Sequence, residues 1–370
     1  MQIACKANVL QHAVQLAESV ISSRNMIPIL QNIVFEAKNN EAKLSSSDLE
    51  ETMIQKIPIE VIEPGNITIE AKTLGEILRL IPNDDEVYIK LESEKNIRIT
   101  CKSESDTMWD LVGTSVSEYP KLPSISGNKS FSIDQLLLKR MIKKTIFAVS
   151  TENTRLILNG ICFEIEKKKL KMAATDGRRL AFNQADLDIG FDFDKIIVPQ
   201  KVLHELLRIL SNEGQVKISV SEKQIAFEID NVILISQLIE GEFPDYDQVI
   251  PKTQSYKVEL KTKELMNKLS MVSVMVSDKV NRVIFSFTGN KLVLSSNDPD
   301  RGESRSEMPI AFDGEDKFEI AFQSKYMNDV LKVIEAENII IGFTAPLSPA
   351  TLKEVGNPDY VSIIMPMKII

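Results

Sequence analysis

The chain has 370 residues, of which 43% are hydrophobic and 26% charged, and its net charge at pH 7 is −9. This composition is typical of a soluble globular protein, and the acidic balance argues against a uniformly basic DNA-binding domain or a membrane-surface protein. Cys5, Cys101 and Cys162 have no CxxC spacing, the start has no signal-peptide core, and no apolar run reaches the roughly 20 residues of a membrane span. We therefore expect a reduced, cytoplasmic protein without a metal site.

The N-terminal segment predicts a short strand followed by a helix. Lys6–Ile21 has apolar residues at helical spacing, including Leu10 and Val14. Similar helices are predicted at Ser132–Val149 and Thr262–Val276, and a strand-like run precedes each of them. The first helix is thus expected in three copies.

A hairpin pattern recurs with the same spacing. Asn159–Ala181 has an apolar strand, a lysine turn, and a second strand that ends before a Thr-Asp-Gly break. Related patterns start at Asn32 and Arg282, and three units of this length fill the chain. Each copy has a Phe in its first strand and an Asp after its second, namely Phe35, Phe163 and Phe285, and Asp48, Asp176 and Asp298.

A second helix also occurs three times, with apolar residues at i, i+3, i+4 and i+7, the spacing of one helix face. On a single helix the charged opposite face would be interpreted as solvent-exposed, but repetition in register favours a shared role. That face carries Lys72, Glu76 and Arg79 in the first copy, Lys201, Glu205 and Arg208 in the second, and Lys325, Asp329 and Lys332 in the third.

Alternating strands follow each second helix, and proline-containing segments separate the copies at Glu118–Gly127 and Glu240–Lys252. The sequence therefore predicts an α+β protein with three repeated domains, 1–126, 127–252 and 253–370. Each domain should have antiparallel sheets covered on one side by two helices.

Catalysis has little support in the sequence. The chain has no phosphate-binding loop, HExxH or GxSxG motif, and His12 and His204 lie in predicted helices, where structural roles are favoured. The acidic run Asp186–Asp194 does not have calcium-loop spacing and is interpreted as a solvated loop. We expect no catalytic residue, cofactor or metal.

Basic residues gather on the predicted helices of this acidic chain, so phosphates would be attracted to one face and repelled elsewhere. No aromatic residues are interleaved with these charges, and base stacking is not indicated. The candidate phosphate-facing residues are Lys139, Arg140, Lys143 and Lys144, then Lys263 and Lys268, and on the second helices Arg79, Lys201, Arg208, Lys325 and Lys332.

Helix spacing limits what a ring of these repeats could enclose. Six helices about 10 Å apart give a circumference of roughly 60 Å, which leaves a hole too narrow for duplex DNA. Twelve helices from two chains give roughly 120 Å and a hole near 30 Å, which a duplex can pass. Ring closure by two chains is therefore a hypothesis that the repetition permits.

At ATDGRRLA (174–181), FPDYDQVIP (243–251) and IIMPMKII (363–370) the chain resembles the bacterial DNA polymerase III beta subunit family, the sliding clamps. The likeness covers the whole length. It implies a head-to-tail homodimer that closes as a ring around duplex DNA, with helices lining the hole. It also implies a non-catalytic, nucleoid-associated processivity factor that tethers the DNA polymerase III alpha subunit, the clamp loader and other replication and repair proteins through short peptide motifs.

The resemblance also implies site residues. Arg24 matches a DNA-contacting position, Trp109 and Leu111 match one side of the dimer interface, and Val274 and Met275 match the other. Gln248 stands where the family often has Arg, and Leu156 and Ile157 stand where well-known members have Tyr. The implied peptide pocket consists of Leu158, Thr175, Gly177, Arg178, Arg179, Leu180, Pro244, Val249, Leu347, Pro349, Ile363, Met365, Pro366, Met367, Lys368 and Ile369.

Two other functions are alternatives: a three-repeat scaffold that binds peptides without encircling DNA, and, more distantly, an enzyme. Retention on nicked circular against short linear duplex separates a clamp from a scaffold, and any turnover would favour an enzyme.

Overall fold

The structure is a computed structural model that describes residues 1–22, 26–104, 106–123, 129–152, 154–277, 280–314 and 317–369. Arg24 lies outside the described residues. The chain groups into two compact units, Met1–Leu136 with Lys201–Leu238, and Leu137–Gln200 with Ile239–Ile370. Among the described residues, no helix is long and apolar enough to cross a membrane.

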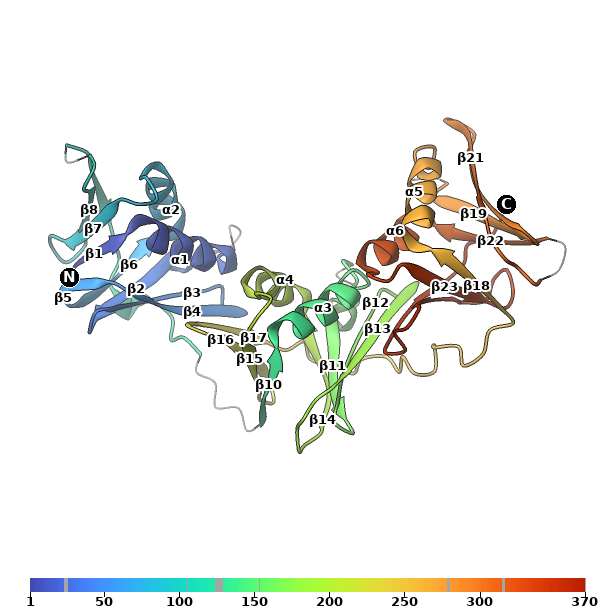
Figure 1. Ribbon diagram of the computed structural model, residues 1–370. Coiled ribbons are helices and arrows are strands. Elements are labelled where there is room, and N and C mark those ends of the chain that lie inside the picture. The colour runs from blue at the N-terminus through green and yellow to red at the C-terminus, as the bar shows by residue number, and fades with distance from the viewer. Residues whose placement is uncertain are drawn as a thin grey trace. The chain divides into compact units, whose positions relative to one another are not determined.

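A strand, a helix, a group of strands, a second helix and three further strands follow one another three times along the chain (Figure 1). In the first helix Leu10, Val14 and Ala17 are buried, so the predicted apolar stripe packs inward. The first copy consists of β1 (Gln2–Lys6), α1 (Ala7–Val20), η1 (Pro28–Gln31), β2 (Asn32–Lys38), β3 (Glu41–Ser47), β4 (Glu51–Pro58), β5 (Glu60–Glu63), β6 (Gly65–Glu70), α2 (Ala71–Leu80), β7 (Glu86–Leu91), β8 (Asn96–Cys101), β9 (Met108–Val112) and η2 (Val116–Glu118).

The second copy contains the predicted lysine turn. Lys167 and Lys168 have φ of 52° and 62°, the left-handed conformation that suits a two-residue turn between twisted strands. The first helix begins later than position 132 because the preceding strand stays paired through Asp134. This copy consists of β10 (Lys129–Asp134), α3 (Gln135–Ile146), η3 (Leu156–Leu158), β11 (Gly160–Glu166), β12 (Lys169–Thr175), β13 (Arg179–Asp186), β14 (Phe193–Pro199), α4 (Gln200–Ile209), β15 (Gln215–Val220), β16 (Gln224–Ile229) and β17 (Val232–Gln237).

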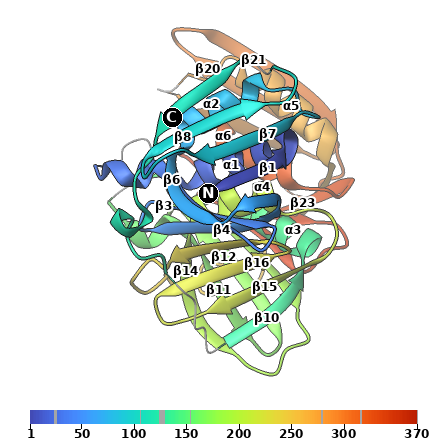
Figure 2. The same ribbon diagram turned by 90° about the vertical axis from the view of Figure 1, so that its left-hand side faces the viewer.

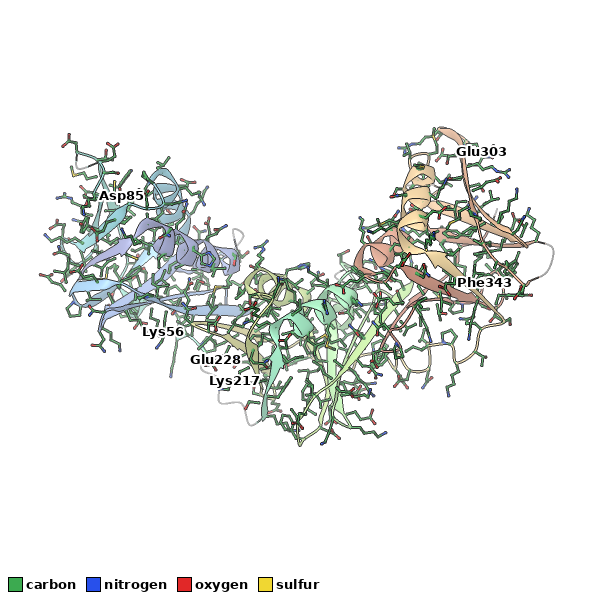
Figure 3. The ribbon with its side chains drawn as sticks, in the orientation of Figure 1. Lys56, Asp85, Lys217, Glu228, Glu303 and Phe343 are labelled. Carbon is green, nitrogen blue, oxygen red and sulfur yellow. The ribbon has the colours of Figure 1, made fainter. Side chains whose placement is uncertain are left out.

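The third copy has an aromatic core. The ring of Phe343, labelled in Figure 3, lies 4.7 Å from the ring centroids of both Phe287 and Phe318. Stacked and tilted rings of this kind bury large apolar areas and fix the packing of the sheets. The third copy consists of β18 (Tyr256–Lys261), α5 (Thr262–Ser273), β19 (Arg282–Thr288), β20 (Lys291–Asp298), β21 (Gly302–Pro309), β22 (Phe318–Gln323), α6 (Ser324–Val333), β23 (Asn338–Phe343), β24 (Ala350–Glu354) and β25 (Tyr360–Ile364).

The described residues of the first unit form two antiparallel sheets, of order β5-β1-β7-β8-β9 and β10-β15-β16-β17-β4-β3-β2-β6. The second sheet contains strands of two copies, because β17 pairs with β4 and Leu234 lies opposite Met53. In Figure 2 these sheets face the viewer. Figure 1 shows α1 and α2 together on one side of the strands.

The second unit repeats this arrangement. Its described strands form sheets of order β14-β11-β12-β13-β25-β24-β23-β18 and β21-β20-β19-β22. Here β13 of the second copy pairs with β25 of the third, and Ala181 lies opposite Ser362. The predicted α+β class, with antiparallel sheets and two helices per copy, is confirmed.

The compact units do not coincide with the three expected domains. Each of the two large sheets continues from one copy into the next, so close contacts gather around a sheet and not around a single copy. The domain boundaries after residues 126 and 252 stay a prediction.

Candidate functional site

An apolar cluster in the second unit forms the floor of the predicted peptide pocket. Leu158, Leu180 and Ile363 come from η3, β13 and β25, and each has at most 3% of its surface exposed. Cys162 belongs to the same cluster, and burial raises the pKa of its thiol to about 12. The thiol is therefore protonated and unreactive at neutral pH. Three of the predicted residues, distant in sequence, thus meet in one place.

The segment after β17 is fixed over this floor by Tyr246. Its Oη donates a hydrogen bond to Glu164 Oε2 at 2.7 Å, and its ring lies 5.4 Å from that of Phe182. Burial, and then the hydrogen bond to Glu164, raises the pKa of Tyr246, so the hydroxyl remains a donor. The predicted pocket residues Pro244 and Val249, on either side of Tyr246, are exposed.

The C-terminal segment contains further residues of the predicted pocket. The Met365 N–H donates to Arg178 O at 2.9 Å, and the Met367 N–H donates to Ala321 O at 2.7 Å. Backbone bonds therefore hold this segment between β13 and β22. Met365 and Ile369 remain 40% and 44% exposed, which leaves apolar surface available to a ligand. Of the other predicted residues, Leu347 and Lys368 are exposed, and Pro349, Pro366 and Met367 are half-buried.

The turn between β12 and β13 presents Gly177 and Arg178 to solvent. Asp176 Oδ1 accepts the N–H groups of Arg178 and Arg179 at 2.9 and 3.0 Å, and Thr175 Oγ1 accepts that of Gly177 at 3.0 Å. Gly177 has φ of 85°, which glycine adopts without strain.

Arg179 differs from the other predicted pocket residues because its guanidinium is bound inside the protein. Its Nε donates to Asp176 Oδ2 at 3.0 Å, and its Nη1 donates to Asp329 Oδ2 on α6 at 2.7 Å. The guanidinium also lies 4.4 Å from the ring centroid of Tyr326. We therefore revise its predicted role from a peptide contact to a residue that positions the turn.

The basic residues of α3 do not all face solvent. Arg140 and Lys143 are exposed and Lys139 is half-buried, but Lys144 is buried with its Nζ 2.6 Å from Glu354 Oε2. Burial would raise the pKa of Glu354, but the hydrogen bonds from Lys144, Asn357 and the Glu335 N–H, together with the charge of Lys144, outweigh burial and lower the pKa. The prediction that Lys144 faces DNA is wrong, because its charge is neutralised inside the second unit.

The charged face of the second helices has a role that the repeat pattern did not reveal. Lys201 of α4 donates to the Asp48 carboxylate and lies 3.3 Å from Glu51 Oε2. Asp329 of α6 receives Arg179. In both units this face holds the turn that follows the central hairpin of the preceding copy, so Lys201 is only partly available to DNA.

The remaining predicted phosphate contacts are at least partly exposed. Arg208 lies 3.1 Å from the buried Glu205, and Arg79 lies 3.7 Å from Glu18 in a surface ion pair of small energetic value. The others lie on α5 and α6, where Lys263, Lys325 and Lys332 are exposed and Lys268 is half-buried.

Two of the predicted interface residues lie on an edge strand, and the other two follow α5. Trp109 and Leu111 are half-buried on β9, an edge strand of the first unit. Val274 is 70% exposed and directly follows α5. The end of α5 is bound to the edge strand β21, because Ser304 Oγ of that strand donates a hydrogen bond to Val272 O at 2.9 Å. Met275, next to Val274, is half-buried.

Comparison with known proteins places this geometry in a family. Three sequence models of the DNA polymerase III beta subunit match, the N-terminal domain at residues 1–123, the central domain at 132–245 and the C-terminal domain at 247–368. A curated beta sliding clamp from Bacillus subtilis is 31% identical over 381 residues and covers 100% of both chains. The chain belongs to the DNA polymerase III beta subunit family.

Solved clamps have the same fold over the full length. The sliding clamp of Bacillus subtilis superposes with a TM-score of 0.94 at 30% identity, and a clamp from Pseudomonas aeruginosa bound to griselimycin with 0.94 at 28%, each covering 100% of both chains. As a member of this family the chain is a processivity factor of DNA replication and not an enzyme. Its family implies DNA and polymerase partners and a homodimer.

Sequence reasoning missed several residues that shape this clamp. Glu164 and Glu51 belong to no motif, and the roles of Tyr246, Glu164 and Glu51 depend on partners far away in the chain. The only signal is indirect, since Tyr246 lies inside FPDYDQVIP, a stretch that carries the resemblance but predicts no role for its tyrosine.

Proposed function

We propose that two copies of this chain close into a ring around duplex DNA through β9 of one copy and β21 of the other. The supporting observation is a pairing rule within the chain. The last strand of one copy pairs with the third strand after the first helix of the preceding copy, as β17 does with β4 and β25 with β13. Only β9 and β21 hold these two places without such a partner among the described residues.

The rule also gives a register. Trp109 holds the same place in its copy as Leu234 and Ser362, and Ser304 holds the same place as Met53 and Ala181. Since Leu234 lies opposite Met53 and Ser362 opposite Ala181, we expect Trp109 to lie opposite Ser304 of the second copy. Leu111, Val274 and Met275 would then be covered as well. A contact of this head-to-tail kind that closes after two chains gives a two-fold ring.

We propose that the helix cations that are at least partly exposed contact the phosphate backbone without reading sequence. Lys139, Arg140 and Lys143 on α3 are the main candidates, and Lys263, Lys268, Lys325 and Lys332 add to them. Arg24, Arg79, Lys201 and Arg208 remain secondary candidates. Such binding is weak, falls as salt rises, and needs ring topology for a long lifetime.

We further propose that the pocket in the second unit binds short peptide motifs of the polymerase alpha subunit, the clamp loader and other DNA enzymes. Exposed Val249, Leu347 and Met365 around a buried apolar floor suit aliphatic and aromatic side chains. Arg178 and Lys368 add positive charge at the rim. In the cell, rings loaded on DNA would be found with the nucleoid.

Retention on DNA of different topology tests the ring. Protein loaded on nicked circular duplex should remain through gel filtration at moderate salt, and cutting the circle should release it quickly. Equal retention on circular DNA and on linear duplex with both ends free would identify an ordinary DNA-binding protein. A chain that bound the peptides but neither DNA would be the three-repeat scaffold.

A further inference from the structure

Three carboxyl groups gather around one lysine where β4 meets α4 in the first unit. Lys201 Nζ donates to Asp48 and lies 3.3 Å from Glu51 Oε2, and the buried Glu205 adds a negative charge near Glu51. Glu51 is 2% exposed, and apart from the ion pair with Lys201 neither of its carboxyl oxygens has a hydrogen-bond partner among the described residues. A buried carboxylate so poorly satisfied is unfavourable in its ionised form.

The other titratable groups around Glu51 do not neutralise it. On α4, His204 is exposed and Arg208 is engaged by Glu205. The turn adds the exposed Glu50, and Tyr119 donates and accepts only at the backbone of Ser47. Of the other packed elements, β17 has no titratable side chain, β3 presents serines at this end, and α1 contributes only His12 and Glu18. Negative charge therefore exceeds positive charge around Lys201.

We propose that Glu51 carries a proton near neutral pH and that loss of this proton loosens the pairing of β17 with β4. Burial raises the pKa of Glu51 from 4.5 to about 7, against the opposing effect of Lys201 and with that of Asp48. Between these two values the folded chain binds more protons than the unfolded chain. The free energy of unfolding of the first unit therefore falls as pH rises through this window, and levels off above it.

Glu51 lies where β4 of the first copy pairs with β17 of the second, so its protonation affects the connection between these two copies. Glu51 lies opposite Ser236 of β17, and the Gln237 N–H donates to Glu50 O at 2.9 Å. In the second unit the same position is Arg179, which Asp176 and Asp329 satisfy. The pH dependence should therefore be confined to the first unit.

Carbon-13 NMR of the side-chain carboxyl groups in the full-length protein tests the proposal, with the Glu51 signal assigned by its loss in Glu51→Gln. We expect this carboxyl to titrate near pH 7. Hydrogen exchange of the amides of residues 233–236, corrected for intrinsic rates, should show opening at least fivefold more frequent at pH 8 than at pH 6. Glu51→Gln should remove that difference, and the matched exposed variant Glu50→Gln should keep it.

Titration of the wild-type Glu51 carboxyl near its ordinary value would overturn the proposal, as would a Glu51→Gln protein that kept the wild-type pH dependence of exchange. Where the variant folds poorly, titration of the wild-type protein decides, because the Glu51 signal can also be assigned through its backbone.

Discussion

The turn after the central hairpin has closely similar backbone bonding in the first and second copies, but the side chain at its end has opposite charge. Asp48 Oδ1 accepts the N–H groups of Glu50 and Glu51 at 3.0 and 2.8 Å, as Asp176 Oδ1 does for the two equivalent residues. Leu49 and Gly177 both have positive φ, 79° and 85°. Yet Glu51 occupies the place of Arg179.

The comparison shows that the backbone of the turn requires the Asp, whereas the residue at the end of the turn can differ between the two junctions. The Asp is present in both turns because it binds backbone N–H groups that the turn leaves unpaired. The residue three positions later meets the second helix of the next copy, and it can be an acid or a base as long as that helix offers a side chain that can pair with it. Lys201 is that partner for Glu51, and Asp329 is that partner for Arg179.

The largest effect is expected for Arg179→Ala, which removes the cation at the end of the turn in the second copy. The substitution leaves Asp176 and Asp329 without their buried cation, so we expect the second unit to lose about 3–5 kcal/mol of unfolding free energy. Denaturant unfolding measures this, with the exposed neighbour Arg178→Ala as the matched control. A loss for Arg179→Ala no larger than the control would show that the pair contributes little.

The third copy has the equivalent turn at Asp298. Under our proposal, the second helix that packs against this turn belongs to the other chain. Val274→Arg or Met275→Arg would place an unpaired charge in that interface and should weaken dimerisation by about 3 kcal/mol, more than a hundredfold. Native mass at nanomolar concentration measures the dimer, with the exposed Met271→Arg on α5 as a comparison. Dimers that persisted in both variants would refute the interface.

Removal of Met365–Ile370 tests a second difference between the units, because only the second unit is proposed to have a peptide pocket. Affinity for a polymerase-tail peptide should fall at least tenfold, about 1.4 kcal/mol, while the chain stays folded and dimeric. Met367→Ala should have a smaller effect, and Met271→Ala, outside the pocket, should have none. Unchanged peptide binding after the deletion would remove the pocket assignment.

The smallest effect is expected for Lys201→Ala in the first unit. Although Lys201 occupies a place similar to that of Asp329, Glu51 already carries a proton at pH 6 under our proposal and Asp48 can bind one when the lysine is lost, so we expect a cost of only about 1 kcal/mol at pH 6. The cost should grow as pH rises to 8. Thermal unfolding at both pH values measures it, and a pH-independent cost would contradict a protonated Glu51.

Much of this architecture could be predicted because its signals are local. The apolar stripes of the helices and the Phe residues of the hairpins depend on spacing within a few turns or strands, and they recur three times. The bonds of Arg179 to Asp329 and of Lys144 to Glu354 join residues far apart in sequence, so their charges looked like a solvated face and a DNA contact. The peptide pocket stays a prediction from the resemblance, because its proposed floor combines residues of η3, β13 and β25 that are far apart in sequence.

Closure of the ring is the central claim, and a covalent ring tests it most directly. Trp109→Cys with Ser304→Cys should form a disulfide across the proposed β9–β21 contact, since opposed residues of antiparallel strands lie within bonding reach. The oxidised dimer is threaded onto linear duplex, the duplex is ligated into a circle, and the mixture is washed at high salt. We predict that the protein stays on the circle until the DNA is cut or the disulfide is reduced. Failure to form the disulfide dimer, or loss of the oxidised dimer from intact circles as fast as from linear DNA, would contradict the ring.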